Sequence, residues 1–338
     1  MKAEAACTPA LVACVRDSEE ARARVTCRRL APPLDGCVCA GVLSPAECAD
    51  LRAEADAMGY SFWHENAEGA CPHALKAAAR GVCAAASAAD TLTQPPARAD
   101  GAPRAFRNAD TVEVTCPEVA AALWARLQAF ATPEVRLTPE DAAADDGAAC
   151  ERGLDGTWRA CGVNPVLLFS RYGPGGHFSP HTDGNTVVDL NRRSLASVIL
   201  YLNDCGDGGE TALFAPPADA PADARRLFRR DDAQRLRWPP GWVADAAPAR
   251  MGSALLFAQH VAHEGAPVGP GCEKLIIRTD IMYERHPPLC DDEAGRDAYR
   301  LWRDAGAAEA AGDAAGAVAL YRRCAKRSPA FAALMGLG

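Results

Sequence analysis

Short apolar runs, each bounded by Gly, Pro, Asn or Asp, fill the middle of the chain between residues 165 and 283. Two of the longest are 195–202 and 275–283, which are rich in Leu and Ile. Several short strands separated by turn residues are typical of a β-sandwich or a β-barrel. Residues 215–250 are rich in Pro, and we predict that they form a long insertion between two of these strands.

A strand followed by a helix is predicted ahead of the β region. Residues 36–42 alternate between apolar and other side chains, as a strand does. Ser44 is a suitable N-cap, Pro45 fits the first helical position, and Glu47 completes a capping box. The pattern predicts that this helix runs to Ala57.

Helical periodicity is also found on either side of the β region. We predict a helix over 117–130, where Ala, Leu and Trp recur on one face. The segments 299–312 and 314–327 are amphipathic and resemble one tetratricopeptide helical hairpin, a unit that cannot bury its apolar face alone. We expect this pair to pack on the β core. The alternative is that it binds a protein partner.

These patterns predict an α+β fold with a mainly β core, flanking helices and a C-terminal helical hairpin. The expected parts are an irregular N-terminal segment (1–35), a helical support region with loops (36–160), the β domain (161–286) and the helical hairpin (291–338).

Composition and charge exclude a few classes of protein. The chain of 338 residues is 49% hydrophobic and 24% charged, which is typical of a globular protein. Its net charge is −8 and no basic cluster occurs, so we expect no nucleic-acid partner. No apolar run reaches transmembrane length, and the stretch around Pro9 is a poor signal peptide. We therefore expect no membrane partner and a cytoplasmic location.

The chain contains 15 cysteines, which are scattered from Cys7 to Cys324. The closest pair is Cys37 and Cys39, and no pattern of zinc-finger spacing occurs. For a cytoplasmic protein, this distribution predicts mostly reduced thiols.

The string RYGPGGHFSPHTD (171–183) contains the strongest candidate for a metal site. Residues i and i+2 of a strand point to the same face, so His181 and Asp183 can converge on one point. Two histidines and one carboxylate form the ligand set of non-haem Fe(II) oxygenases, which leaves open positions on the metal. A His-x-Asp pair alone is weak, because it occurs by chance in many proteins.

A third ligand is expected from His263, which follows a strand-like run 80 residues later. His260, of opposite strand parity, is a rival for this position. His177 lies four residues before His181 and is a weaker candidate, because the Gly-Pro-Gly-Gly turn breaks the strand there.

Two cations follow this candidate metal site along the chain. Lys274 is one of only four lysines and begins a predicted strand, and Arg278 lies four residues further on. Both can face the interior with Ile276 between them. Either could bind the distal carboxylate of a 2-oxoacid that chelates the metal.

The three strings RYGPGGHFSPHTD (171–183), GGET (208–211) and HEGAPVGPGCEK (263–274) together resemble the prolyl 4-hydroxylase-like branch of the 2-oxoglutarate/Fe(II) dioxygenases. The resemblance covers roughly 165–285, and the segment 36–60 is similar to the helix that precedes the barrel in that family. It implies a double-stranded β-helix, or jelly-roll, core.

The resemblance also implies roles for particular residues. His181, Asp183 and His263 match the iron ligands, and Lys274 matches the residue that pairs with the C5 carboxylate of 2-oxoglutarate. One extra residue before Lys274, relative to the family pattern, keeps Arg278 open as the alternative. Three further residues match positions lining the co-substrate pocket: Tyr172, Tyr201 and Thr211.

The activity implied is hydroxylation of a C–H bond with Fe(II), 2-oxoglutarate and O2; L-ascorbate is suggested by the family likeness alone. The carboxylate of Asp183 favours hydroxylation over halogenation, because halogenases have a small residue at that position. A peptide or protein side chain, proline above all, is the first expectation for the substrate. The alternatives are a free amino acid or another small molecule, and a non-enzymatic scaffold that acts through the C-terminal hairpin.

Overall fold

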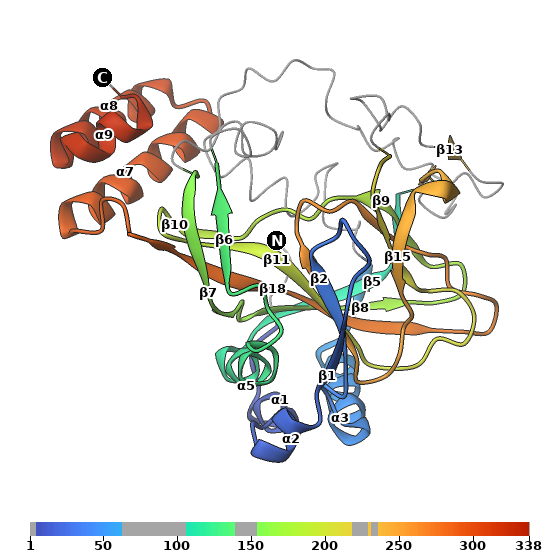
Figure 1. The fold of residues 1–338 in the computed structure, drawn as a ribbon. Coiled ribbons are helices and arrows are strands. Elements are labelled where there is room, and N and C mark those ends of the chain that lie inside the picture. The colour runs from blue at the N-terminus through green and yellow to red at the C-terminus, as the bar shows by residue number, and fades with distance from the viewer. Residues whose placement is uncertain (1–4, 63–105, 139–153, 218–228, 231–235, 338) are drawn as a thin grey trace.

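Two antiparallel β-sheets form the centre of the molecule, and apolar side chains from both sheets cluster between them (Figure 1). The computed structural model describes residues 5–62, 106–138, 154–217, 229–230 and 236–337. Within these ranges the larger sheet has eleven strands, eight of which follow one another in the order β1 (Thr26–Arg29), β2 (Gly36–Ala40), β16 (Ala254–Ala258), β11 (Arg192–Tyr201), β18 (Lys274–His286), β8 (Val166–Tyr172), β5 (Asp110–Thr115) and β3 (Ser61–Phe62). At one end, β7 pairs with β18, β6 with β7 and β10 with β11, over β6 (Glu134–Leu137), β7 (Gly156–Val163) and β10 (Val187–Asp189).

The smaller sheet faces the inner side of the larger one. Its order is β15 (Val243–Ala247), β12 (Thr211–Phe214), β17 (His263–Gly265), β9 (His177–His181) and β4 (Arg107–Asn108). The region 215–250 was expected to be an insertion, yet β15 within it pairs with β12. It also contains the short pair β13 (Arg229–Arg230) and β14 (Leu236–Arg237), and a 3-10 turn at Pro240–Trp242.

Successive side chains of β18 alternate between the outer core and the inner core. Leu275 and Ile277 point to the outer core beneath the helices, whereas Ile276 points to the inner core between the sheets. Lys274 and Arg278 share the inner face with Ile276, as their spacing predicts. The strand therefore carries charged groups into the space between the sheets without breaking the outer core.

Helices cover the outer face of the larger sheet (Figure 1). The capping box predicted from Ser44 and Glu47 is present in both halves, and it begins α3 (Pro45–Met58). The predicted second helix ends earlier than expected, as α5 (Pro117–Leu127), and a turn follows it. Leu51 of α3 and Leu123 of α5 are buried in the outer core.

The N-terminal segment, expected to be irregular, contains two short helices and a strand. Thr8 caps α1 (Pro9–Cys14) and Ser18 caps α2 (Glu19–Ala23), and β1 pairs with β2. Helices of five or six residues are too short to show periodicity, so tertiary packing rather than sequence pattern decides them. The expected boundary between residues 160 and 161 falls inside β7.

Three helices follow β18 at the end of the chain: α7 (Glu293–Ala310), α8 (Ala314–Arg327) and α9 (Pro329–Met335). They contact one another, and Tyr299, Phe331 and Cys324 form a small buried cluster. Leu190, beyond β10, packs against this cluster and links it to the larger sheet.

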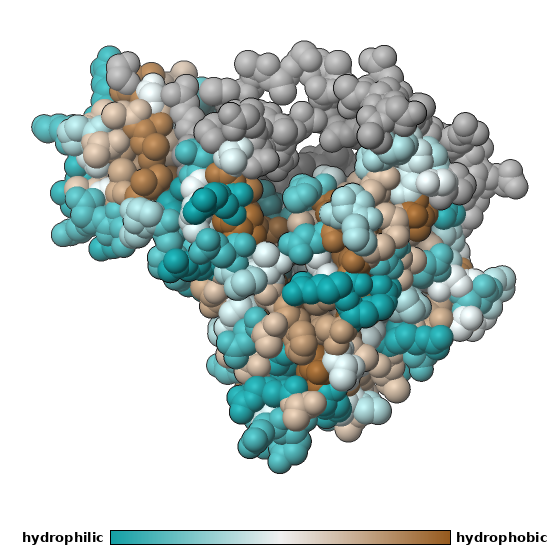
Figure 2. All heavy atoms as spheres, viewed as in Figure 1, coloured by the Kyte–Doolittle hydropathy of each residue, from teal (hydrophilic) through white to brown (hydrophobic). Residues whose placement is uncertain are grey.

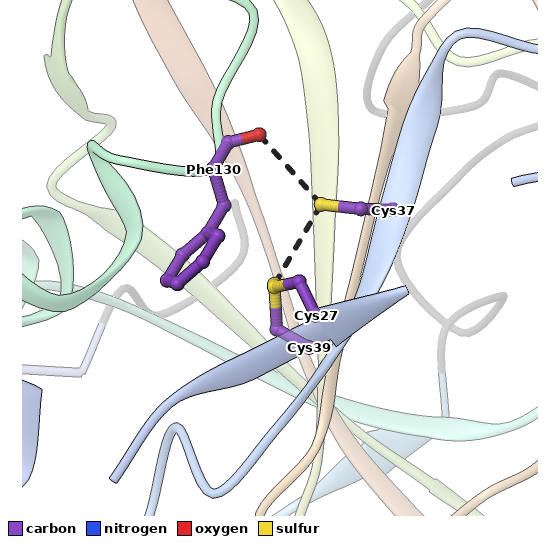
Figure 3. The surroundings of a disulfide bond; sticks show 4 residues. All are labelled: Cys27, Cys37, Cys39 and Phe130. Carbon is purple, nitrogen blue, oxygen red and sulfur yellow. Dashed lines mark hydrogen bonds between the residues drawn. A yellow bond between two sulfur atoms is a disulfide. The ribbon is translucent and has the colours of Figure 1, made fainter. Parts of the chain in front are cut away.

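Cys27 and Cys39 form a disulfide bond between the paired strands β1 and β2 (Figure 3). The expectation of reduced thiols therefore does not hold for these two residues, because β1 places them directly opposite each other, a pairing that the sequence did not reveal. The thiol of Cys37 lies 3.6 Å from the sulfur of Cys39. Ten other cysteines within the described residues are free.

On the face shown in Figure 2, hydrophobic side chains of the described residues are interspersed with hydrophilic ones. None of the helices in the described part of the chain is long and apolar enough to cross a membrane.

Candidate active site

His181, Asp183 and His263 meet in the space between the two sheets. His181 ends β9 and His263 begins β17, and the two residues are direct cross-strand partners. Asp183 follows two residues after His181, and its backbone N–H donates to the carbonyl of Gln259. The carboxylate of Asp183 lies 3.8 Å from Nε2 of His181 and 3.7 Å from Nε2 of His263. The three side chains could hold one metal ion.

Backbone carbonyls fix the orientation of both imidazole rings. Nδ1 of His181 lies 2.8 Å from the carbonyl oxygen of Ser179, and Nδ1 of His263 lies 3.0 Å from that of Val261. Because a carbonyl only accepts, each Nδ1 carries the proton and each Nε2 lone pair faces the other ligands. This is the tautomer that a metal ligand requires.

The protonation states of the three groups also fit a cation. Burial lowers the pKa of His181 to about 3, and burial likewise lowers the pKa of His263. Both imidazoles are therefore neutral at neutral pH. Burial alone would raise the pKa of Asp183, but the guanidinium of Arg278 and the facing imidazoles hold it well below its usual range. Two neutral imidazoles and one carboxylate match the donor set that suits Fe(II).

Two further groups hold the carboxylate of Asp183 in place. The hydroxyl of Ser197 donates to its Oδ2 at 2.6 Å, and Nη2 of Arg278 lies 3.5 Å from its Oδ1. Arg278 also lies 3.0 Å from Asp280, which is fully buried. Asp280 in turn accepts hydrogen bonds from three side chains: Asn164, Thr186 and Gln259. A buried polar network therefore supports the metal-facing carboxylate from behind.

The triad faces a cavity of about 160 Å³ between the sheets. Its walls are mostly apolar and aromatic, with three cationic side chains among them, Arg107, Lys274 and Arg278. Arg107 donates to the hydroxyl of Ser170 and lies over the ring of Phe178, which stacks on His181. A mostly apolar cavity with a few convergent polar groups is typical of a small-ligand site.

Lys274 lies on the inner face of β18, four residues from Arg278 toward the strand's N-terminal end. Its side chain is buried, and its Nζ lies 5.3 Å from the ring centre of Tyr172 and 5.8 Å from that of Tyr201. Burial lowers the pKa of Lys274 to about 8. Among the described residues no carboxylate forms an ion pair with it. A buried, largely protonated amine of this kind is a ready partner for a ligand carboxylate.

The hydroxyl of Tyr201 donates to Oγ1 of Thr211 at 2.8 Å. Because Thr211 accepts this bond, its own hydroxyl hydrogen is left to be donated elsewhere. Thr211 lines the cavity together with Lys274 and Tyr172. The three residues therefore offer donors to an anion at this end of the cavity.

The first glycine of the GGET string, Gly208, occupies a position where no other residue would fit. Gly208 has a φ of +64°, and a Cβ there would lie 2.1 Å from the carbonyl oxygen of Pro267. The next residue, Gly209, donates its N–H to the same carbonyl. The close approach brings the loop before β12 against the loop before β18, and so helps to close the cavity around Lys274.

The structure brings most of the residues singled out in the sequence into one place. His181, Asp183, His263, Lys274 and Arg278 all line the cavity, as do Tyr172 and Thr211, and Tyr201 lies beside it. The rival histidines His177 and His260 are not part of the metal-facing cluster.

Sequence reasoning missed Ser197, Gln259 and Arg107. The signal for Ser197 was present, since it lies four residues before Tyr201 on one strand and therefore shares its face. Arg107 and Gln259 reach the site through pairings between distant segments, for which the sequence contains no local signal.

Residues 167–279 match the sequence model of the 2OG-Fe(II) oxygenase superfamily. The protein is therefore a 2-oxoglutarate-dependent dioxygenase, and the cofactors of this class are Fe(II), 2-oxoglutarate and O2. This finding removes the non-enzymatic scaffold as an account of the β domain.

Three solved structures are similar to this chain at low identity. A Pseudomonas putida prolyl-4-hydroxylase is 19% identical, with 53% of this chain and 70% of that chain covered and a TM-score of 0.27. A viral collagen prolyl hydroxylase from Paramecium bursaria Chlorella virus-1 is 18% identical, with 53% and 80% covered and a TM-score of 0.27. A Trichoplax adhaerens prolyl hydroxylase in complex with a hypoxia inducible factor peptide is 15% identical, with 57% and 67% covered and a TM-score of 0.28. Comparison with curated proteins gives no match.

Proposed function

We propose that this protein is a hydroxylase that inserts oxygen into a C–H bond of a peptide or protein side chain, with proline as the first candidate. When bound, Fe(II) couples the oxidative decarboxylation of 2-oxoglutarate by O2 to oxidation of the substrate. The observation that carries the proposal is the His181, Asp183 and His263 cluster, with a buried cation, Lys274, further along the same cavity.

His181, Asp183 and His263 are proposed to hold the iron. The donor atoms point at one another from two strands and the turn that follows β9, and both imidazoles are neutral. These three protein ligands would leave the metal open to the co-substrate and O2.

Lys274 is proposed to bind the C5 carboxylate of 2-oxoglutarate, with help from the hydroxyls of Tyr172 and Thr211. The alternative, Arg278, is already paired with Asp183 and Asp280 at the metal end of the cavity. Lys274 has no such ion pair among the described residues. Four residues along a strand separate the two side chains by about 13 Å at their Cα atoms, so the two cations serve opposite ends of the cavity.

Arg278 is proposed to be a positioning residue for Asp183. Its guanidinium lies between two carboxylates, and removing it would leave both anions buried without a cation.

The preference for a peptide or protein substrate rests on the likeness of the 171–183 and 263–274 strings to prolyl 4-hydroxylase-like enzymes. We also propose that the two sheets form a double-stranded β-helix. α7 and α8 are proposed to form the C-terminal helical hairpin. A division of the chain into 1–35, 36–160, 161–286 and 291–338 is also proposed, except at the 160/161 boundary, which falls inside β7. A protein partner for the hairpin remains a proposal.

The activity can be tested in two steps. Fe(II) and 2-oxoglutarate added without oxygen should produce a weak visible charge-transfer band, and admission of air with substrate should produce succinate. A library of proline-containing peptides and free amino acids, scanned for a mass gain of one oxygen, then identifies the substrate class. Absence of both the band and succinate would contradict the enzyme assignment, whereas oxidation of small molecules alone would contradict the peptide substrate.

A further inference from the structure

Two cysteine sulfurs from distant parts of the chain lie in very close contact beneath the larger sheet. Sγ of Cys7 lies 2.9 Å from Sγ of Cys116, across 109 positions of sequence. The backbone fixes the approach, because Ala5 forms a bridge with Val114 and donates its N–H to the carbonyl of Glu113. The segment before α1 is thereby aligned with the end of β5, where Cys116 occupies the N-cap position of α5.

The separation of the two sulfurs discriminates between the states that such a pair can adopt. Two thiolates on one tetrahedral zinc, at about 2.3 Å each from the metal, are about 3.8 Å apart. The sulfurs of Cys37 and Cys39, which are not bonded to each other, lie 3.6 Å apart in this structure. A disulfide needs about 2.05 Å. At 2.9 Å the Cys7 and Cys116 sulfurs are closer than either alternative allows, and less than about 1 Å of movement would complete the bond.

We propose that Cys7 and Cys116 form a second disulfide bond in the folded protein. The two thiols lose two protons and two electrons, and a disulfide oxidant such as oxidised glutathione takes them up and becomes two thiols. The nearby Glu118 has its carboxylate 3.8 Å from the sulfur of Cys116 and could join the two cysteines around a metal ion. The sulfur separation argues against that arrangement.

The bond would secure the junction of three helices. Thr8, next to Cys7, caps α1 and donates to the carboxylate of Glu54 in α3 at 2.8 Å. α1 contacts both α3 and α5. The new bond would tie the segment before α1 to the start of α5, whereas Cys27–Cys39 links β1 to β2 within the N-terminal segment.

Peptide mapping without reduction tests the proposal directly. The full-length protein is folded with a glutathione redox pair, its free thiols are alkylated in denaturant, and it is digested with trypsin. We expect the peptides 3–16 and 108–126 to be recovered as one linked species. Cys7→Ser should abolish the link, whereas Cys14→Ser should preserve it, because Cys14 lies in the same peptide but bonds only to the carbonyl of Ala10 among the described groups.

Alkylation of both Cys7 and Cys116 in the oxidised protein would overturn the proposal, whether or not Cys27 and Cys39 are linked. Recovery of stoichiometric zinc, with both thiols protected in the native protein but unlinked after denaturation, would overturn it as well. As a second measurement, the wild-type Tm should fall in dithiothreitol by about 5 °C more than that of the Cys7→Ser/Cys116→Ser variant. Equal shifts would count against a stabilising bond.

Discussion

The carboxylate of Asp183 depends on neighbours that are not themselves ligands. Ser197 donates to it at 2.6 Å, and this bond orients the carboxylate toward the two imidazoles. Groups that orient metal ligands typically contribute a factor of 10 to 100 in metal affinity. A small hydroxyl on β11 is thus part of the metal site as much as the ligands are.

We therefore expect Ser197→Ala to weaken binding of Mn(II), used as a stable substitute for Fe(II), by about 10- to 100-fold. Titration followed by electron paramagnetic resonance measures this affinity without turnover. Ser170→Ala is the control, since Ser170 lines the same cavity but contacts Arg107 instead. Equal affinity in the two variants would show that the hydroxyl of Ser197 does not orient Asp183.

Substitutions of Lys274 and Arg278 should affect different properties, namely the KM for 2-oxoglutarate and the affinity for Mn(II). Lys274→Ala removes the proposed partner of the co-substrate, and loss of a charged hydrogen bond should raise the KM for 2-oxoglutarate by about 10- to 100-fold. Mn(II) affinity should be unchanged. Arg278→Gln should instead weaken Mn(II) binding, because Asp183 then loses the guanidinium that holds its carboxylate in position. The reverse pattern would exchange the two proposed roles.

The lowered pKa of Lys274 predicts a pH dependence for co-substrate binding. The protonated amine binds the carboxylate, and its pKa in the free enzyme is about 8, so protonation falls as the pH rises through this value. The dissociation constant for 2-oxoglutarate, measured with Mn(II) and no oxygen, should therefore increase above pH 8. In Lys274→Arg the side chain stays charged, and the increase should disappear. A flat profile for the wild type would contradict the prediction.

At the scale of elements, the capping box of α3 is connected to a buried ion pair. Glu47 accepts the backbone N–H of Ser44 and also pairs with Arg126 of α5, whose side chain is fully buried. The helix start therefore anchors α5 as well as α3.

This double role predicts unequal costs for two neighbouring substitutions. Ser44→Ala loses only the cap and should lower the free energy of unfolding by about 1 kcal/mol. Glu47→Ala also leaves the buried guanidinium of Arg126 without a counter-ion, which should cost about 3–5 kcal/mol. Urea unfolding followed by circular dichroism compares the two. Similar costs would mean that the ion pair contributes little.

Local rules predicted some elements well and others not at all. The capping box, the inward parity of Lys274 and Arg278, and the convergence of His181 with Asp183 all follow from spacing within one segment. The pairing of β9 with β17 joins segments that are distant in sequence. The contact between Arg278 and Asp280, which lie on one strand, depends on how their side chains pack. The sequence therefore predicted two cations in the cavity, but it did not show which one already had partners.

At the scale of the whole molecule, the N-terminal segment is a structural part of the domain. β1 and β2 extend the larger sheet beyond β16, and Phe257 of β16 packs against the ring of His263. The disulfide between Cys27 and Cys39 holds the two outer strands together. Disulfides persist mainly in oxidising compartments, so this bond is at odds with the cytoplasmic location expected from the sequence.

Expression in two compartments tests that conclusion. We expect the full chain to give a higher yield of folded protein when it is exported to the bacterial periplasm than when it is made in the reducing bacterial cytoplasm. Far-ultraviolet circular dichroism and Mn(II) binding measure the folded fraction. A Cys27→Ser/Cys39→Ser variant should show a smaller difference between compartments, and an equal yield of the wild type in both would argue against a need for oxidation.

The strand β18 also limits how such an enzyme can diversify. Lys274, Arg278 and Asp280 occupy alternate positions of one unbroken strand, so inserting or deleting a single residue between them would turn some of these charges out of the cavity and bring apolar side chains in. Changes of chain length are tolerated far better in the connections between strands. New substrate preferences should therefore arise by remodelling of those loops, while the length of β18 between residues 274 and 280 stays constant.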